Sequence, residues 1–202
     1  MRNAGRPGGF EKREGMIRPG QDIVLAGYAG LAGTRILGRA HRQEAERWFH
    51  PGFLRCLDEP DPYDAAAWFE GQEKNEHCPF TAYMPAGEGG VLAAVWDLSG
   101  SYETGVQVDL TQIPMRQVTV ELCERYELNP YRLLCANCIL AAADQGGRLV
   151  RLLAEAGIPA AVIGWAQEGD ARRVLHGEEA AGYLERPQPD ELLRAGFPGP
   201  WG

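Results

Sequence analysis

The sequence predicts a single α+β domain. Short apolar or alternating runs, which are typical of strands, and longer amphipathic runs, which are typical of helices, follow one another irregularly along the chain. No segment repeats at a fixed period, and no internal linker divides the chain. Its 202 residues are enough for one domain with a real core, and 45% hydrophobic with 24% charged residues is ordinary for a globular protein.

The segment from Ile113 to Ala143 is the part around which the rest is organised. Val118, Leu122 and Tyr126 fall on one helical face, and Pro130 stops that helix because the residue before a proline is pushed out of the α region. A tight turn follows, and then a short apolar run at 139–143 that we interpret as a buried strand.

The other elements are predicted from periodicity and from turn residues. Further strands are expected at 22–28, 80–84, 106–110, 160–165 and 172–175. Further helices are expected at 35–49, 51–56, 64–71, 91–98, between Gly147 and Gly157, and at 190–195. Thr34 is expected to cap the first of these helices, and Gly157 to terminate the helix before it.

We divide the chain into an arm at residues 1–19, a domain at 20–197 and a tail at 198–202. The arm is rich in glycine and basic residues and has no hydrophobic period or secretory signal. A net charge of −8 without a basic stripe argues against nucleic acid and membrane surfaces as partners. No run is apolar enough to span a membrane, and five scattered cysteines indicate a reduced, cytoplasmic protein.

Several motifs occur in a fixed order: Pro-Gly-Gln-Asp with a glycine-rich continuation, Glu-Gly-Gly, a Pro-Met-Arg-Gln helix, Leu-Asn-Pro-Tyr and Asp-Glu-Leu. They lie at 19–34, 88–90, 114–124, 128–131 and 190–192. Together they resemble the C-terminal domain of the AIR synthase-related family, which includes aminoimidazole ribonucleotide synthase and the hydrogenase-maturation carbamoyl dehydratase. The resemblance runs from about residue 17 to about 194 and implies a mixed sheet layered against helices.

The resemblance also implies an activity. Family members use ATP to activate an oxygen or carbamoyl group for dehydration or cyclisation. Acidic residues of a preceding N-terminal domain mainly hold the nucleotide and its magnesium, and the C-terminal domain closes the cleft. The sequence here leaves room before Pro19 only for the arm.

This chain departs from the family pattern at polar positions. Met84, Pro85 and Gly87 replace a His-Asp pair and a threonine, and neither methionine nor proline can transfer a proton. Ala32 replaces an acid. Asn137 stands where the family has a turn glycine, which is consistent with a left-handed conformation.

Two glycine turns are candidate ligand sites because helix N-termini present free N–H groups to anions. The predicted ligand-binding residues are Gly30, Gly33, Thr34, Glu88, Gly89, Gly90 and Asn137. Neither turn has the spacing of a dinucleotide or P-loop fingerprint, so glycine serving only the backbone geometry stays open. We predict no catalytic residue and no resident metal, since a lone carboxylate at Glu88 is a poor cation site.

Cys135 and Cys138 form a Cys-x-x-Cys pair. A structural zinc site needs four ligands, and a thioredoxin-type pair opens a helix after a strand, whereas this pair precedes a strand. Two buried thiols acting as small apolar groups is the simpler interpretation, and a metal-sensing pair is the alternative. The histidines, at 41, 50, 77 and 176, are interpreted as surface residues.

Two functions remain open. The first is a non-catalytic binding or regulatory module, without a cofactor, that pairs with itself or with a full-length relative. The second is half of an ATP-dependent synthase or dehydratase, completed by a separately encoded N-terminal domain and then using Mg-ATP.

Overall fold

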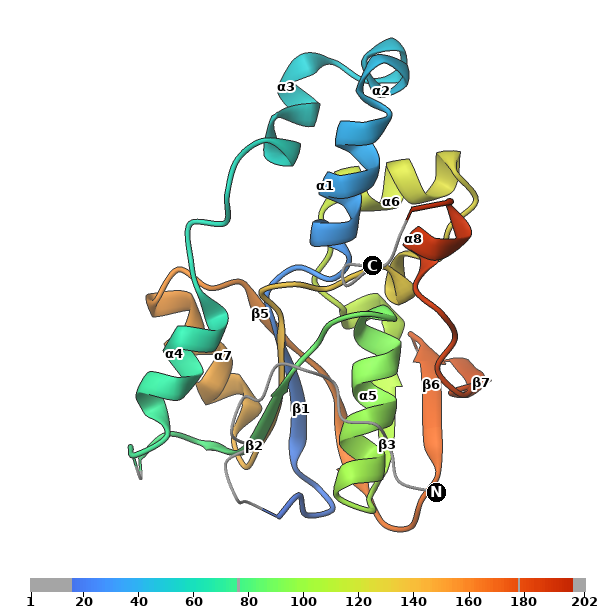
Figure 1. The fold of residues 1–202 in the computed structure, drawn as a ribbon. Helices are drawn as coiled ribbons and strands as arrows, with labels where there is room; N and C mark the ends of the chain where they lie inside the picture. Colours follow the sequence, from blue (N-terminus) through green and yellow to red (C-terminus); the bar gives the residue numbers. More distant parts are fainter. Residues whose placement is uncertain (1–15, 76, 178, 198–202) are drawn as a thin grey trace.

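The computed structural model describes residues 16–75, 77–177 and 179–197, which form one seven-stranded sheet with helices around it (Figure 1). The strand order is β2-β4-β1-β5-β3-β6-β7. All neighbouring strands are antiparallel except β3 and β6, which are parallel. The strands are β1 (Asp22–Ala26), β2 (Phe80–Pro85), β3 (Gly105–Asp109), β4 (Ile139–Ala143), β5 (Ala160–Gln167), β6 (Arg172–His176) and β7 (Glu179–Tyr183). The sheet is mixed, as the resemblance implied.

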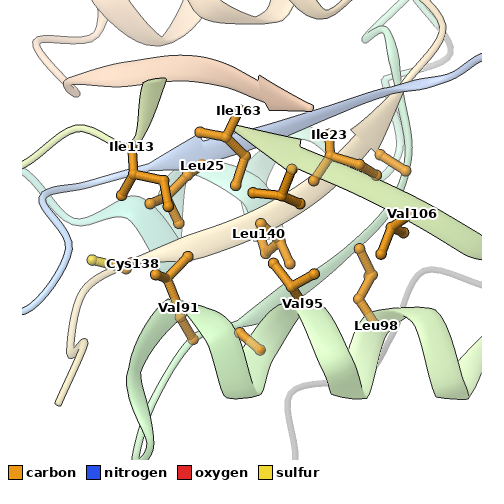
Figure 2. Packing of buried hydrophobic residues seen from close by; sticks show 14 of the residues in the cluster. Ile23, Leu25, Val91, Val95, Leu98, Val106, Ile113, Cys138, Leu140 and Ile163 are labelled. Carbon is orange, nitrogen blue, oxygen red and sulfur yellow. The ribbon is translucent and has the colours of Figure 1, made fainter. Parts of the chain in front are cut away.

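Helix α5 (Gly90–Ser101) covers one face of this sheet. Val91, Val95 and Leu98 on α5 pack against Ile23 and Leu140 of the central strands (Figure 2). Side chains alternate across a strand, so the neighbours of these strand residues point to the opposite face. This alternation divides β1 and β4 between two hydrophobic layers.

The opposite face carries α4 (Ala65–Gln72) and α7 (Gly146–Glu155). Phe69 of α4 and Leu149 and Leu153 of α7 are buried there against Val24 and Ala141. The five residues of β4 are all buried, because helices cover both of its faces.

The remaining helices gather beyond one end of the sheet (Figure 1). They are α1 (Leu31–Ala40), α2 (Arg42–Trp48), α3 (Pro51–Leu54), α6 (Gln117–Arg125) and α8 (Glu191–Arg194). Leu37, Leu54, Leu122 and Leu192 are buried in a third hydrophobic cluster between them. This helical cluster places the start of α1 and the start of α6 close to the end of the sheet.

The structure corrects several details of the sequence prediction. The helix expected at 35–49 begins at Leu31 and breaks at His41 into α1 and α2. Thr34 lies inside α1 and is not its cap, because Gly30 with φ 69° already starts the helix. Strand β7 was not predicted, since its Glu-Ala-Ala-Gly-Tyr sequence has no strand pattern and it forms by pairing with β6.

Of the two predicted helix stops, the one at Pro130 is wrong. Helix α6 ends at Arg125, where Glu127 turns the chain with φ 54°, and Pro130 begins a separate 3-10 helix, Pro130–Arg132. The stop at Gly157 is confirmed. Gly157 terminates α7 with φ 74°.

The ends of the chain are only partly described. Residues 1–15 of the predicted arm and the tail at 198–202 lie outside the described residues. Ile17, within the predicted arm, is buried against the α5 layer, and Arg18 pairs with Asp144 at 3.0 Å. Across the described residues, no helix has the length and apolar character needed to cross a membrane.

Candidate functional site

The two glycine turns begin α1 and α5. Gly30 (φ 69°) precedes α1 and Gly89 (φ 77°) precedes α5, and neither helix has a side-chain cap. Gly90, the first residue of α5, is also left-handed with φ 70°. The first N–H groups of both helices therefore need other acceptors.

A single segment, residues 130–138, lies against both turns. The N–H of Gly33 donates to the carbonyl of Leu134 at 3.1 Å. A Cβ atom on Gly30 would lie 2.9 Å from the carbonyl oxygen of Pro130, and one on Gly90 would overlap that of Tyr131. Glycine is required at these positions because the backbone of residues 130–138 approaches them so closely. The chain itself therefore fills the space beside both turns.

The sulfur of Cys135 lies where the two helices begin. It accepts hydrogen bonds from the N–H of Gly30 at 3.1 Å and from the N–H of Val91. Cys138 lies beside Cys135, and its thiol donates a hydrogen bond to the carbonyl oxygen of Tyr28 at 3.2 Å. The neighbouring Cys138 thiol lowers the pKa of Cys135 although Cys135 is buried, and the Cys135 thiol, together with burial, raises the pKa of Cys138.

Asp190 completes the second turn. One carboxylate oxygen accepts from the N–H of Gly89 at 2.8 Å, and the other accepts from the N–H of Leu192 at 2.9 Å, which caps α8. Asp190 is 1% exposed, so this carboxylate is a buried connection between α5 and α8. From the sequence, Asp190 could be recognised only as the start of a helix. Its hydrogen bond to Gly89 could not be foreseen, because 101 residues separate the two along the chain.

Thr34 is fully buried. Its hydroxyl donates to the carbonyl of Gly30 at 2.7 Å and lies 2.9 Å from the hydroxyl of Thr119 on α6. The side chain therefore joins α1 to α6.

Asn137 adopts φ 56°, as its place in the turn predicted. Its amide oxygen accepts from the N–H of Ala65 at 2.8 Å, and its amide nitrogen donates to the carbonyl of Tyr63 at 2.9 Å and to Asp61 at 3.2 Å. These contacts join residues 61–65, which lead into α4, to the turn before β4.

Glu88 is half-buried, and within the described residues it makes no hydrogen bond or ion pair. Met84 and Pro85 are half-buried at the end of β2, paired with Leu140 and Ile139. Thus Glu88 alone among the seven predicted site residues offers a polar side chain that the described fold does not use.

This arrangement does not fit a phosphate or Mg-ATP at the glycine turns. The N–H groups of Gly30 and Val91 already donate to Cys135, that of Gly89 donates to Asp190, and backbone fills the space beside Gly90. Within the described ranges no three His, Cys, Asp or Glu side chains are grouped as metal ligands would be. We therefore derive no chemical step through a nucleotide at these turns.

The histidines lie where surface residues were predicted. His50, His77 and His176 are exposed, and His41 is partly exposed beside the ring of Tyr126. His50 caps α3 by accepting from the N–H of Gly52 at 3.1 Å.

The structure shows an open surface that the sequence did not indicate. Arg116, at the start of α6, lines a groove of about 350 Å³ with Arg55 and Cys56 and a second groove of about 300 Å³ with Tyr28 and Tyr63. Its guanidinium lies 4.3 Å from the centre of the Tyr28 ring, and within the described residues it has no acidic partner. Arg116 belongs to the Pro-Met-Arg-Gln motif, but the motif gave no sign of these grooves, because the other residues that line them come from four separate parts of the chain.

Comparison with known proteins establishes the fold. No protein-family model and no curated protein matches the sequence. Solved structures do: E. coli HypE, a hydrogenase maturation protein, aligns with a TM-score of 0.69 and 17% identity over 88% of this chain. Thiamine-monophosphate kinase from Stenotrophomonas maltophilia aligns with a TM-score of 0.60 and 20% identity over 84%, and T. maritima PurL with 0.55 and 18% over 89%.

These proteins are members of the AIR synthase-related family, so the fold that the sequence motifs implied is confirmed. The chain spans 53% of the E. coli HypE chain, 54% of the kinase and 26% of PurL. Other HypE structures of this fold were determined with ATP or as a HypE–HypF complex.

Proposed function

We propose that this chain is a non-catalytic binding or regulatory module of the AIR synthase-related fold, acting in the cytoplasm. One observation carries the proposal: apart from the side chain of Glu88, the polar groups at the glycine turns are used inside the fold. Cys135, Asp190, Thr34 and Asn137 all bond to the chain's own backbone or side chains. A site whose donors and acceptors are already paired has none left to stabilise a transition state.

The surface around Arg116 supports the binding role. An exposed guanidinium between two grooves, in a chain of net charge −8, is suited to an acidic group on a partner. A second copy of this chain or a full-length relative is the partner that the resemblance suggests. The proposed module needs no cofactor.

Calorimetric titration of the purified chain with Mg-ATP tests the non-catalytic role. We expect no binding in the micromolar range and no release of phosphate on prolonged incubation. Micromolar binding or turnover by the chain alone would show that the glycine turns open to nucleotide, and the proposal would fail.

Self-association is tested separately by sedimentation of wild type and of Arg116→Ala, with Arg148→Ala on α7 as the control. If a second copy is the partner, wild type and the control dimerise while Arg116→Ala dissociates at a concentration at least tenfold higher. Dimers unaffected by Arg116→Ala would place the interface elsewhere.

A second candidate function is half of an ATP-dependent enzyme completed by another chain. It is favoured by the extent of the match, because the chain spans about half of HypE. Glu88 would then be the acid that this chain contributes to the completed cleft. Mixing the chain with a separately produced N-terminal domain of HypE tests the idea: ATP turnover in the mixture, absent from either part and reduced by Glu88→Gln, would support it over the binding module.

A further inference from the structure

The turn before β4 brings two thiols together. Ala136 and Asn137 occupy the turn between Cys135 and Cys138, and the two thiols are close enough for each to shift the pKa of the other. A β-turn holds its first and fourth Cα atoms within about 7 Å, and a disulfide spans Cα atoms about 4.4–6.8 Å apart. The backbone between these cysteines is therefore already folded into a shape that a disulfide can close.

The two thiols lie in unequal surroundings. Cys135 receives N–H groups at the starts of α1 and α5, where the helix dipoles favour negative charge. Its pKa is lowered by the neighbouring Cys138 thiol and by these donors. Cys138 faces the carbonyl oxygen of Tyr28 at 3.2 Å and keeps its proton. Cys135 is thus the nucleophile and Cys138 the resolving thiol.

Neither a metal site nor simple packing accounts for this arrangement as well. No third metal-ligating side chain joins the pair within the described residues. Cys123 shows what a buried cysteine among apolar groups looks like here, since burial raises its pKa to about 12 and it meets no second thiol. Cys135 and Cys138 differ from Cys123 because each has the other thiol beside it, and because Cys135 also receives two backbone N–H groups.

We propose that Cys135 and Cys138 are a redox-active dithiol that closes to a disulfide in the folded chain by exchange with a low-molecular-weight disulfide. The Cys135 thiolate attacks one sulfur of the reagent, so that a mixed disulfide forms and one thiolate leaves. Cys138, losing its proton to solvent, then attacks the Cys135 sulfur and displaces the second thiolate. Two electrons pass from the protein to the reagent, which leaves as two thiols.

Burial controls the rate of this exchange. Cys135 is 0% exposed and Cys138 1%, so a reagent reaches them only when residues 130–138 move away from the glycine turns. Restricted access of the reagent slows the approach to equilibrium but does not change where the equilibrium lies. The test is therefore an equilibrium measurement.

The full-length chain is equilibrated with mixtures of reduced and oxidised glutathione, quenched with acid, and digested with trypsin. Cleavage at Arg132 and Arg148 releases residues 133–148, which hold both cysteines of the pair and no other. Closure of the disulfide appears as this peptide lighter by two hydrogen atoms. The same titration in concentrated urea gives the reference for the unfolded chain.

We expect the folded chain to favour the disulfide at least tenfold more than the unfolded chain does, because the turn holds the thiols together. Cys123→Ala, which keeps the pair, should give the wild-type value. Cys138→Ala should give no closed peptide and only a glutathione adduct on Cys135. A folded chain that forms the disulfide no more readily than the unfolded one, or that remains reduced while the partly exposed Cys56 is glutathionylated, would overturn the proposal.

Discussion

The carboxylate of Asp190 accepts a hydrogen bond from the backbone N–H of Gly89 over 2.8 Å, although 101 residues separate the two along the chain. This contact closes the glycine turn before α5 and fixes α8 against it. Because Asp190 is buried, the contact has an energetic consequence that can be measured.

Replacing Asp190 by alanine leaves the N–H groups of Gly89 and Leu192 buried without their acceptor. We expect a loss of about 3 kcal/mol in the free energy of unfolding, measured by urea denaturation. Asp190→Asn keeps an acceptor oxygen and should lose less. Asp64, an exposed cap of α4 that accepts from Ala67 at 3.0 Å, is the matched control, and Asp64→Ala should cost about 1 kcal/mol. Equal losses at the two positions would contradict the role given to Asp190.

Gly90→Ala tests whether the chain itself fills the turn. Gly90 and Gly157 have nearly the same left-handed backbone, with φ 70° and 74°, but only at Gly90 would a methyl group overlap the backbone of Tyr131 and Arg132. Gly157→Ala should cost about 1–2 kcal/mol from backbone strain alone. Gly90→Ala should cost at least about 2 kcal/mol more, because backbone atoms cannot rotate away. Similar melting temperatures for the two variants would mean that the turn has free space.

Asn137 combines a left-handed backbone with three hydrogen bonds to residues 61–65, the segment that leads into α4. Asn137→Gly removes the hydrogen bonds but also removes the strain of the left-handed backbone. Asn137→Ala removes the hydrogen bonds and keeps this strain. We expect both variants to be less stable than wild type, the alanine variant by about 1 kcal/mol more than the glycine variant. A glycine variant as stable as wild type, by thermal unfolding, would show that Asn137 serves only the turn.

We expect Asp144 to make a contribution to the stability of the folded chain that depends on pH. Its pKa is lowered by the hydrogen bond from Gln21 at 2.8 Å and by Arg18 at 3.0 Å. A carboxyl whose pKa is lower in the folded chain stabilises it at pH values above the unfolded pKa, near 4, and that contribution disappears as the pH falls through the folded pKa. The difference in melting temperature between wild type and Asp144→Asn should be present at pH 6 and shrink below about pH 4. A difference that is constant over this range would rule out the ionised form as its source.

The sequence by itself determined the elements whose signals are local. Three features follow from periodicity and steric limits among neighbouring residues: the apolar run at 139–143, the end of α7 at Gly157 and the left-handed Asn137. The stop expected at Pro130 was wrong, because a left-handed Glu127 already ends α6 at Arg125. The ordered motifs also led to the right fold. The start of α1 was misplaced by a few residues, because a threonine is a common cap and Gly30 could equally have been an ordinary turn.

Only the tertiary structure decided what the predicted site residues contact. Four features depend on contacts between segments that are far apart in the chain. They are strand β7, the link between Asp190 and Gly89, the position of Cys135 between two helix starts, and the exposed Arg116 between two grooves. Such contacts depend on how complete helices and strands pack against one another. The periodicity of residues within a single helix or strand cannot predict them. The same glycines that marked a turn in the sequence prove to make room for the chain's own backbone, since a hydrogen atom is all that fits between α5 and residues 130–138.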